Sequence, residues 1–543
     1  MTDPVQNQSP PFAGYNLASH DRQLCSIRAL YGLENTPDGS FFQYGKRCGA
    51  AESLALGRLA NENKPQLKTH DPYGRRLDQV EFHPSYHALM RRSFDVGLHC
   101  ASVEAMDPAA GHVHLERACL FYMMTQVEAG HLCPITMTNA AGFSLADSET
   151  LGAEWLPRIK SRKYDQRFLP VNAKQGVTIG MGMTEKQGGT DLRRVITTAE
   201  ITSEDYYLLN GHKWFFSAPM CDAFLVLARR PAGPTCFLVP RLLETGEVNN
   251  LNLMRLKNKL GNHSNASSEV EFVDAAGWLL GEEGKGIQRI LKMVTPTRID
   301  CALASAALMR ASLMRAVHHT RYRSVFGQHL IEQPLMQRVL ADMALDVAAA
   351  TALAMRLAYA LQLCNEDESE AAFLRIMTPA AKYWICKVAG AVTGEAMECL
   401  GGNGYVEDFD QARIYRESPV NAIWEGSGNV MALDVLRVLN KNPDVFESFC
   451  NLLKAALGPS GEVSIDVLKS AAESAQQDPG NARILTEQLA ITGAAAALKQ
   501  SVPAEISDAF METRLAGQWR STYGMLEQRY NAKDIIDWLY PPL

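Results

Sequence analysis

The spacing of apolar residues changes twice along the chain. Within residues 41–175, apolar side chains mostly recur at helical spacing, as in the stretch ERACLFYMMTQVEAG at 116–130. Between 177 and 283, the apolar runs become short, β-branched or aromatic, and turn residues separate them. From 284 onward, long apolar segments with helical spacing return. This order predicts an N-terminal helical domain, a central antiparallel β domain and a C-terminal helix bundle.

The same pattern places the expected domain boundaries. We expect an N-terminal extension and helical domain at 1–176, the β domain at 177–283, the helix bundle at 284–442 and an additional helical domain at 443–543. Residues 61–78 contain Pro and Gly and are expected to form a loop. Because no long helices are interleaved with the short strands, a dinucleotide-binding βαβ unit is excluded.

Composition narrows the class of protein. A chain of 543 residues is too long for one hydrophobic core, and 47% hydrophobic with 21% charged residues is typical of globular proteins. The net charge of −7 gives no overall attraction to nucleic acid or to an anionic membrane. The stretch MTDPVQNQSP lacks the basic start and apolar core of a signal peptide, so we expect a cytoplasmic protein.

Two further features concern membranes and metals. Arg356 interrupts the most apolar run, 347–363, which we interpret as a buried helix, and we expect no membrane association. The twelve cysteines are scattered without a C-x-x-C pair or a nearby histidine cluster. This pattern is typical of reduced thiols in a cytosol, and we expect no metal site.

Two motifs fall in the predicted β domain. In MGMTEKQGGTDL (181–192), a strand runs into a Thr-Glu step and a Gly-Gly loop, where free backbone N–H groups let the carbonyls or phosphates of a ligand approach closely. In NGHKWFFSAP (210–219), three aromatic residues precede Ser217, an arrangement that suits the wall of a flat ring beside a hydroxyl donor. Each motif also has a purely structural interpretation, a strand end with its turn or a core strand.

Three further motifs fall in the predicted bundle. RYRSVFGQ (321–328) ends a long helix with arginines, which suit either the helix dipole or a pyrophosphate. CLGGNGY (399–405) suits a tight turn or a backbone lying against a cofactor. NAIWEGSGNV (421–430) places Glu425 just before a helix, either as an acid favoured by the helix dipole or as a base held against a flat ligand. No P-loop and no nucleophile elbow accompanies these motifs.

In this order and spacing, the five motifs resemble those of the acyl-CoA dehydrogenases, a family of FAD flavoproteins, over residues from about 115 to 440. GMTEKQGGTD is similar to the family's T-E-x-x-x-G-S-D loop, GHKWFFS to G-x-K-x-W-I-T, RSVFG to R-x-x-F-G, GGNGY to G-G-x-G-[YF] and WEGSGN to Y-E-G-T. More narrowly, ESLALGRLAN, LCPITMT and LGNHSNASSEVEF resemble the AidB-like alkylation-response branch. The resemblance implies a mainly α fold with a central β domain and an additional C-terminal helical domain.

The resemblance also implies that FAD is the cofactor and assigns its contacts. Thr184 would hydrogen-bond the edge of the flavin ring, Met183 would contact it through the backbone, and Ser217 would lie near flavin N5. Phe215 occupies the position where the family usually has a tryptophan beside the ring. Thr190 occupies the position of the serine in the family's T-E-x-x-x-G-S-D loop. The residues implied for the adenosine diphosphate half are Arg323 and Phe326 in a neighbouring subunit, Gly401, Gly402 and Gly404 along the same half, and Ser427 and Asn429 near the adenosine.

Glu425 would be the catalytic base. Dehydrogenation of a thioester requires loss of an α proton while hydride leaves the β carbon for the flavin, and a carboxylate on the opposite face of the acyl chain performs the first step. The resemblance therefore implies α,β-dehydrogenation of a short or branched acyl-CoA by a homotetramer built from dimers. An acyl-CoA oxidase is a close alternative, and the sequence leaves the electron acceptor open.

A second class of function follows from the AidB resemblance, namely DNA binding in the response to alkylation damage, with FAD largely structural and dehydrogenase turnover weak. Residues 441–543 contain nine Lys or Arg and thirteen Asp or Glu, a net charge of −4. Because DNA affinity rests largely on neutralisation of phosphates by cations, this acidic segment disfavours DNA binding unless folding gathers its cations on one face. The cations concerned are Arg514, Arg520, Arg529 and Lys533.

Overall fold

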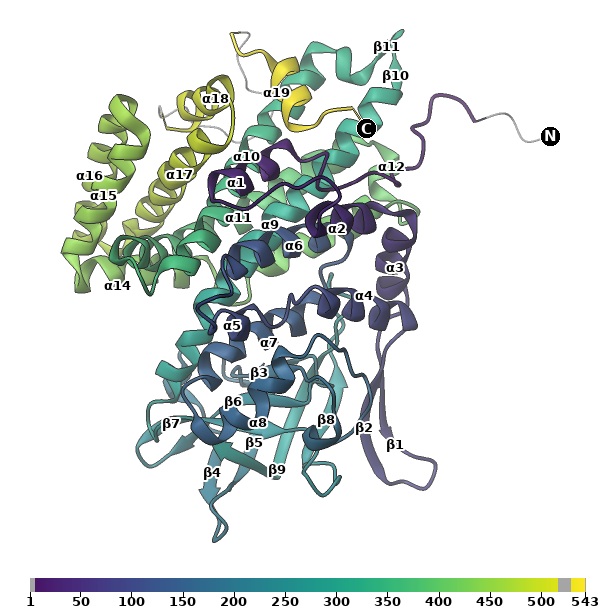
Figure 1. Cartoon of the computed structure of the whole chain (residues 1–543), viewed down its shortest axis with the longest axis vertical. Helices are drawn as coiled ribbons and strands as arrows, with labels where there is room; N and C mark the ends of the chain where they lie inside the picture. The colour runs from purple at the N-terminus through teal and green to yellow at the C-terminus, as the bar shows by residue number, and fades with distance from the viewer. Residues whose placement is uncertain (1–4, 516–528, 543) are drawn as a thin grey trace. The chain divides into compact units, whose positions relative to one another are not determined.

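The computed structural model describes residues 5–515 and 529–542 (Figure 1). The chain forms two compact units, each assembled from separate stretches of sequence. The helical unit consists of Met1–Leu54, His114–Val127 and Arg298–Leu543. The sheet unit consists of Ala55–Val113 and Glu128–Thr297.

The helical unit is built around the long helices α9 (Gly286–Tyr322, in this unit from Arg298 onward), α10 (Pro334–Leu363) and α11 (Glu368–Cys399). α10 packs on α11, and α17 packs on both. The other elements of this unit are α1 (Arg22–Leu30), α2 (Ser40–Gly49), α6 (Val113–Val127), β10 (Ser324–Val325), β11 (Gln328–His329), η3 (Leu330–Glu332), α12 (Gly402–Tyr405), α13 (Asp410–Glu417), η4 (Ser418–Ala422), α14 (Gly428–Lys441), α15 (Pro443–Leu457), η5 (Gly458–Gly461), α16 (Glu462–Gln477), η6 (Pro479–Asn481), α17 (Ala482–Ser501), α18 (Ala504–Arg514) and α19 (Ala532–Leu539).

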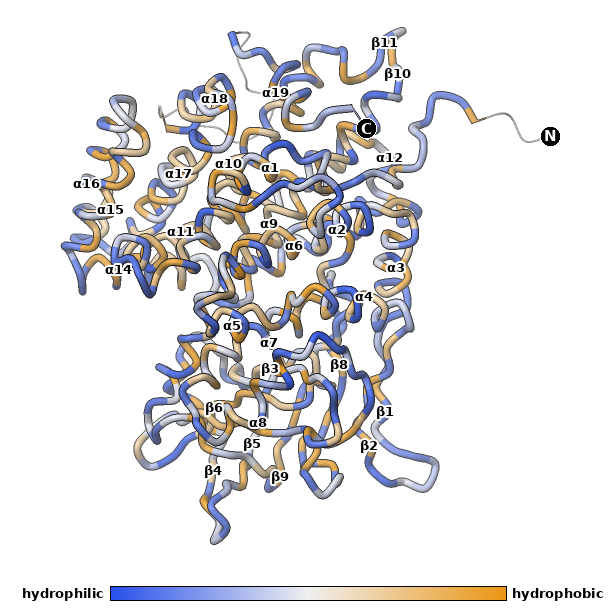
Figure 2. The backbone as a smooth tube through the Cα atoms, viewed as in Figure 1, coloured by the Kyte–Doolittle hydropathy of each residue, from blue (hydrophilic) through white to orange (hydrophobic). Residues whose placement is uncertain are grey.

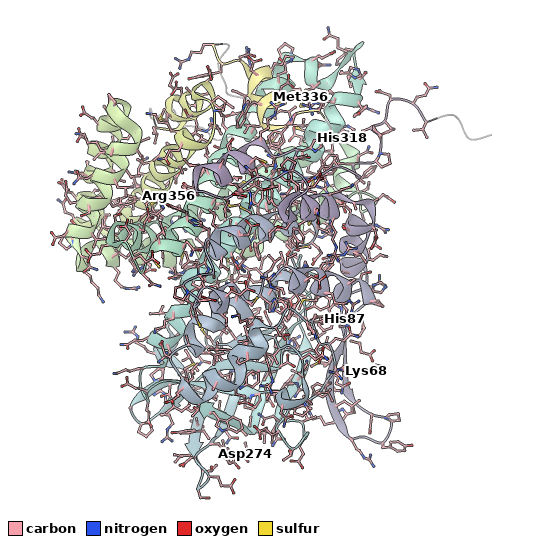
Figure 3. The ribbon with its side chains drawn as sticks, in the orientation of Figure 1. Lys68, His87, Asp274, His318, Met336 and Arg356 are labelled. Carbon is pink, nitrogen blue, oxygen red and sulfur yellow. The ribbon has the colours of Figure 1, made fainter. Side chains whose placement is uncertain are left out.

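α10 is a largely apolar core helix (Figure 2) that carries a few charged side chains, among them Asp342, Asp346 and Arg356. Among the described residues it alone is long and apolar enough to cross a membrane, by length and composition only, yet 83% of its most apolar window is buried inside the protein. Arg356, labelled in Figure 3, forms a bidentate ion pair with Glu370 at 2.6 and 2.8 Å and lies 4.1 Å from the centre of the Phe373 ring. Arg356, which interrupts the apolar run, is therefore neutralised by Glu370 rather than by extending into water.

The sheet unit combines one large sheet with flanking helices and a separate hairpin. The strands of the large sheet are β3 (Ile179–Gly182), β4 (Thr198–Ile201), β5 (Tyr207–Ser217), β6 (Ala223–Arg230), β7 (Gly233–Pro240), β8 (Leu251–Leu256) and β9 (Ser267–Leu279). The other elements are α3 (Ala51–Glu62, which begins in the helical unit), β1 (Gln66–His70), β2 (Arg76–Glu81), α4 (Pro84–Asp95), α5 (Ala101–Glu104), α7 (Leu132–Leu145), α8 (Glu149–Lys160), η1 (Val171–Ala173) and η2 (Leu192–Arg194).

The large sheet closes on itself as a barrel. Its strand order is β3-β6-β4-β5-β9-β7, β8 pairs with β9, and β6 also pairs with β7. Phe216, Phe224, Phe237 and Phe272 are each at most 2% exposed and contribute to its core. The first six residues of β6 are all buried, which explains why this strand is an unbroken apolar run rather than an alternating one.

The mainly helical fold with a central β domain and extra C-terminal helices is confirmed. The sheet is mostly antiparallel, as expected, although β3 and β4 pair with β6 in parallel. The loop expected at 61–78 was wrong in part, because β1 and β2 form an antiparallel hairpin there. The side chains of β1 alternate only between exposed and half-buried, so apolar periodicity gave no strand signal, and Asp71 forms the turn by accepting the N–H groups of Tyr73 and Arg75.

Candidate active site

The loop that follows β3 is a tight turn organised by Glu185. The N–H of Gly188 donates to the Glu185 carbonyl at 2.9 Å, and Gly188 has a φ of +122°, a conformation that favours glycine. The N–H of Lys186 donates to His212 Nε2 at 3.0 Å, which ties the turn to β5. The Thr-Glu step and the Gly-Gly loop of the sequence motif therefore form one turn anchored on the neighbouring strand.

The Glu185 carboxylate is completely enclosed, with 1% of its surface exposed. Lys213 Nζ donates to it at 2.7 Å and Thr197 Oγ1 at 2.6 Å. Further donors are the side chain of Gln187 and the N–H groups of Ile196 and Thr197. Burial by itself would raise the pKa of Glu185, but Lys213 and these donors outweigh it and lower the pKa to about 2. Burial lowers the pKa of the Lys213 ammonium to about 8, although Glu185 opposes that shift. At neutral pH the two side chains thus form a buried ion pair.

Thr184 lies at the point where this turn meets β5. The N–H of Trp214 donates to the Thr184 carbonyl at 2.8 Å. A Cβ at Gly189 would lie 2.4 Å from Thr184 Oγ1, so only glycine permits the loop to fold over this side chain. Met183 and Thr184 are half-buried, whereas Thr190 is exposed.

Phe215 and Ser217 lie at the end of β5, where the strand pairs irregularly with β9. Phe215 is 55% exposed, and Lys257 Nζ lies 4.7 Å from the centre of its ring and 3.6 Å from that of Trp214. Ser217 Oγ is 3.4 Å from Ser267 Oγ on β9. An exposed aromatic face with a hydroxyl two residues further along the same strand suits one side of a planar ring.

Glu425 lies in a left-handed turn immediately before α14. Its φ is +58° and that of Gly426 is +105°. Such a conformation is unfavourable for glutamate and persists only where its surroundings enforce it. Arg298 Nε donates to the Glu425 carbonyl at 3.0 Å, and Lys382 Nζ donates to the Gly426 carbonyl. The side chain of Lys382 on α11 is 1% exposed.

The first turn of α14 carries Ser427 and Asn429. Ser427 is the N-cap residue, but its side chain makes no capping hydrogen bond. A Cβ at Gly428 would lie 2.8 Å from Lys387 Cε, so glycine allows this helix start to approach α11. Asn429 Oδ1 accepts a hydrogen bond from Arg483 Nε of α17 at 2.7 Å. The additional C-terminal helices therefore reach the helix start that the sequence assigned to the adenosine.

Arg323 and Phe326 belong to the short hairpin formed by β10 and β11. Phe326 is 96% exposed with a φ of +53°, so the hairpin presents an apolar ring outward. Arg323 Nη1 donates to the carbonyl of Asn7 at 2.9 Å, and the guanidinium has further N–H groups for a ligand. Phenylalanine is among the residue types enriched at protein–protein interfaces.

The glycine-rich loop forms the connection from α11 to α12. Gly401 has a φ of +60°, and a Cβ added at Gly401 or Gly402 would meet no atom within 4 Å. Gly404 is different, since a Cβ there would lie 2.2 Å from the Met397 carbonyl oxygen. Gly404 thus permits close packing of α12 on α11, while Gly401 and Gly402 offer open backbone to a ligand.

The predicted residues therefore fall into separate groups within each unit. In the sheet unit, Thr184 and Phe215 lie at one place beside the Glu185 turn. In the helical unit, Glu425, Ser427 and Asn429 follow one another at the start of α14. The sequence assigned no role to the side chains that hold these groups: Glu185, Lys213, Lys257, Arg298, Lys382, Arg483 and Asn7. No local pattern distinguishes them from ordinary charged or polar residues, although Glu185 and Lys213 each lie inside a motif.

The cations considered for DNA do not form an open patch where they are described. Arg514 is 8% exposed and pairs with Asp342 at 2.7 Å and with Asp346 at 2.9 Å. The other described cations are also paired with acids, Arg529 with Glu512 and Lys533 with Asp537. Arg520 lies outside the described residues. Since these acids already compensate the charges, the three described cations offer little to a phosphate backbone.

Sequence and structure comparisons identify the family. Residues 7–166 match the N-terminal domain of the adaptive response protein AidB, 180–275 the middle domain of acyl-CoA dehydrogenases and 284–440 their C-terminal domain. AidB of Escherichia coli (strain K12), an acyl-CoA dehydrogenase homologue, is 50% identical over 450 residues, 82% of each chain. Acyl-CoA dehydrogenase family member 11 of Caenorhabditis elegans is 32% identical over 474 residues, 83% of this chain and 75% of that protein.

Solved structures agree with these relatives. The structure of ACDH-11 from C. elegans in complex with C11-CoA superposes with a TM-score of 0.82 at 26% identity, covering 99% of this chain and 93% of that one. The apo form of Bd2924 gives 0.83 at 26% identity, covering 91% and 99%. The chain belongs to the acyl-CoA dehydrogenase family. Within that family it belongs to the AidB branch, as the match of its N-terminal region and its identity to E. coli AidB show.

The family depends on FAD, and the residues described above fit that group. The open backbone at Gly401 and Gly402 is space that a side chain would fill. The exposed ring of Phe215 could pack beside a flavin ring. Arg323, next to the β10–β11 hairpin, offers N–H donors to phosphate oxygens.

Proposed function

We propose that the chain is an FAD-dependent acyl-CoA dehydrogenase in which Glu425 removes the α proton of an acyl-CoA thioester. The observation that carries this proposal is the left-handed turn at Glu425, whose carbonyl and that of Gly426 are held by Arg298 and Lys382. A strained residue fixed by two cations is typical of a positioned functional group. The C11-CoA complex of C. elegans ACDH-11 supports an acyl-CoA as the ligand class.

In the proposed reaction, FAD, Glu425 and the residues around the flavin ring would have distinct roles. Bound FAD would accept the hydride that leaves the β carbon of the substrate. Glu425 would take the α proton. The fixed backbone on both sides of Gly426 would keep the Glu425 carboxylate directed at the substrate. Met183 and Thr184 would bind the ring edge, Phe215 would pack beside it, and Ser217 would donate a hydrogen bond to it. Thr190 would contact the cofactor from the same loop.

The phosphate half of the cofactor would be held in the helical unit. Arg323 would bind the pyrophosphate oxygens, and the open backbone at Gly401 and Gly402 would let them approach. Gly404 would support this loop by packing on α11, while Ser427 and Asn429 would lie near the adenosine. Because the resemblance assigns Arg323 and Phe326 to a neighbouring subunit, we propose a homotetramer built from dimers, with the 96% exposed Phe326 seated in the partner. No disulfide joins any of the twelve cysteines, all of which lie within the described residues, and this supports a cytoplasmic location.

The proposal is tested first by the flavin itself. Purified protein should show a flavin absorbance spectrum, and an anaerobic panel of butyryl-CoA, isovaleryl-CoA and undecanoyl-CoA should bleach it. We expect butyryl-CoA or isovaleryl-CoA to react fastest, since a short or branched chain is proposed. Fastest bleaching by undecanoyl-CoA would contradict only the chain length, whereas absence of flavin even after addition of FAD would contradict the whole proposal. Slow reoxidation by oxygen separates a dehydrogenase from an oxidase.

The base is tested by Glu425→Gln. This variant should retain FAD and bleach about 10²–10⁴-fold more slowly, the range that general acid–base catalysis contributes. Glu407→Gln is a matched control, because Glu407 is an exposed glutamate of the same unit that pairs with Arg416. Bleaching by Glu425→Gln at the wild-type rate would show that another group takes the proton.

A further inference from the structure

The N-terminal strap, defined as residues 5–10, runs along the elements that carry Arg323 and the glycine-rich loop (Figure 1). Asn7 forms a two-way pair with Ser324, since its Nδ2 donates to the Ser324 carbonyl at 2.8 Å and its Oδ1 accepts the Ser324 N–H at 2.6 Å. The Asn7 carbonyl accepts Arg323 Nη1 at 2.9 Å. One residue of the strap thus fixes both the backbone and the guanidinium of the hairpin.

The next residue reaches the second element. Gln8 Oε1 accepts a hydrogen bond from Asn403 Nδ2 at 3.1 Å, and Asn403 lies between Gly402 and Gly404 in the glycine-rich loop. The strap therefore connects two segments that lie far apart in sequence, the hairpin at 323–329 and the loop at 401–404. Both are segments to which the proposed function assigns the phosphate half of FAD.

The strap is itself anchored to the helix that precedes the hairpin. His318 of α9, labelled in Figure 3, is 2.9 Å through Nε2 from the carbonyl oxygen of Pro10. The Phe12 ring packs against His318 in a tilted arrangement with centroids 5.0 Å apart, and Arg315 lies 5.4 Å from the centre of the Phe12 ring. Asn7 has a φ of +53°, a conformation that asparagine tolerates better than most residues. The bonds at Asn7 and Gln8 are therefore made by a segment held in place, not by a free end.

We propose that the strap is part of the cofactor-binding apparatus, with Asn7 and Gln8 as positioning residues that orient Arg323 and the glycine-rich loop toward the phosphates of FAD. The inference rests on the proposed function. Its physical basis is that an arginine fixed by one hydrogen bond loses less freedom when its remaining N–H groups bind a phosphate. A strap that binds both the hairpin and the glycine-rich loop also keeps the distance between them constant. A constant distance is required if the two segments are to bind one pyrophosphate together.

The experiment compares FAD affinity and local hydrogen exchange in three full-length variants. Asn7→Gly removes the side-chain pair without a backbone penalty, because glycine accepts positive φ. Asn7→Asp retains the acceptor for the Ser324 N–H and loses the donor. Gln6→Ala is the matched control, because Gln6 is an exposed neighbour whose side chain makes no hydrogen bond to the described residues. FAD affinity is measured by titration of FAD-free protein, and hydrogen exchange is followed in a peptide that spans 323–329.

We expect Asn7→Gly to bind FAD about tenfold more weakly and to exchange faster at 323–329, with Asn7→Asp between it and wild type. Gln6→Ala should match wild type, and thermal unfolding of the FAD-free variants should not change. An Asn7→Gly affinity within twofold of wild type would overturn the inference and leave the proposed function standing. Unchanged exchange at 323–329 would also overturn it. Failure of wild type to bind FAD would instead overturn the proposed function, and the inference with it.

Discussion

Two glutamates from the same set of motifs have opposite environments. Glu185 in the sheet unit is 1% exposed and accepts hydrogen bonds from Lys213, Thr197 and further donors on both carboxylate oxygens. Glu425 in the helical unit is half-buried, and there it is the backbone that is fixed, in a left-handed turn, by Arg298 and Lys382. The first environment is typical of a carboxylate that maintains structure, and the second is the one that the proposed base requires, a residue whose backbone is fixed in a strained conformation.

The largest effect that would sharpen this contrast is the loss of stability in Glu185→Gln. It would leave the buried Lys213 ammonium without its counter-charge, so we expect a loss of about 3–5 kcal/mol in the free energy of unfolding. The measurement is denaturant unfolding of FAD-free protein. The double variant Glu185→Leu with Lys213→Met removes both charges and should recover much of that loss. A single variant as stable as wild type would show that the ion pair does not support the turn.

Acid titration tests the environment of Glu185 in a second way. Since the folded-state pKa of Glu185 is lowered from 4.5 to about 2, its contribution to stability is complete above pH 4.5 and is lost as the pH falls toward 2. The stability difference between wild type and Glu185→Gln should therefore shrink across that range. Unfolding curves collected at several pH values measure it. A difference that stays constant down to pH 2 would contradict the lowered pKa.

Lys382→Met tests whether the backbone of the Glu425 turn must be held. Removing the donor to the Gly426 carbonyl should let the turn relax, and we expect substrate to bleach the flavin about tenfold more slowly, since small misplacements of a reacting group are costly. FAD content should remain at the wild-type level. Glu398→Gln, an exposed position on the same helix α11, is the matched control and should bleach normally. Equal rates for the two variants would remove Lys382 from a positioning role.

The smallest effect concerns strain at Glu425. Glycine adopts a φ of +58° without steric cost, so Glu425→Gly should raise the free energy of unfolding by about 1 kcal/mol while it abolishes bleaching. Denaturant unfolding alongside the bleaching assay separates the two outcomes. Glu185→Gly should instead lower the free energy of unfolding strongly. Comparing the two glycine variants therefore measures the contrast between the two glutamates directly.

Much of the fold could be predicted because its signals are local. The helical spacing from 284 onward and the short apolar runs between 177 and 283 predicted the order of helices, β domain and bundle, and the motifs predicted the family. The hairpin of β1 and β2 was missed because its strands bury little apolar surface on either face. The parallel pairing of β3 with β6 could not be predicted either, since pairing between strands distant in sequence has no local signature.

The candidate site also has features that local sequence indicates and features that only the folded chain shows. Local sequence patterns were enough to indicate which residues are available: Thr184 in its loop, Phe215 and Ser217 on one strand, and Glu425 ahead of a helix. Only the tertiary structure decided that Glu185 is enclosed and that Asn7 meets Arg323, 316 residues away. The physical reason is that periodicity and turn chemistry depend on neighbours in sequence, whereas burial, strain and the pairing of charges depend on which distant side chains the folded chain brings together.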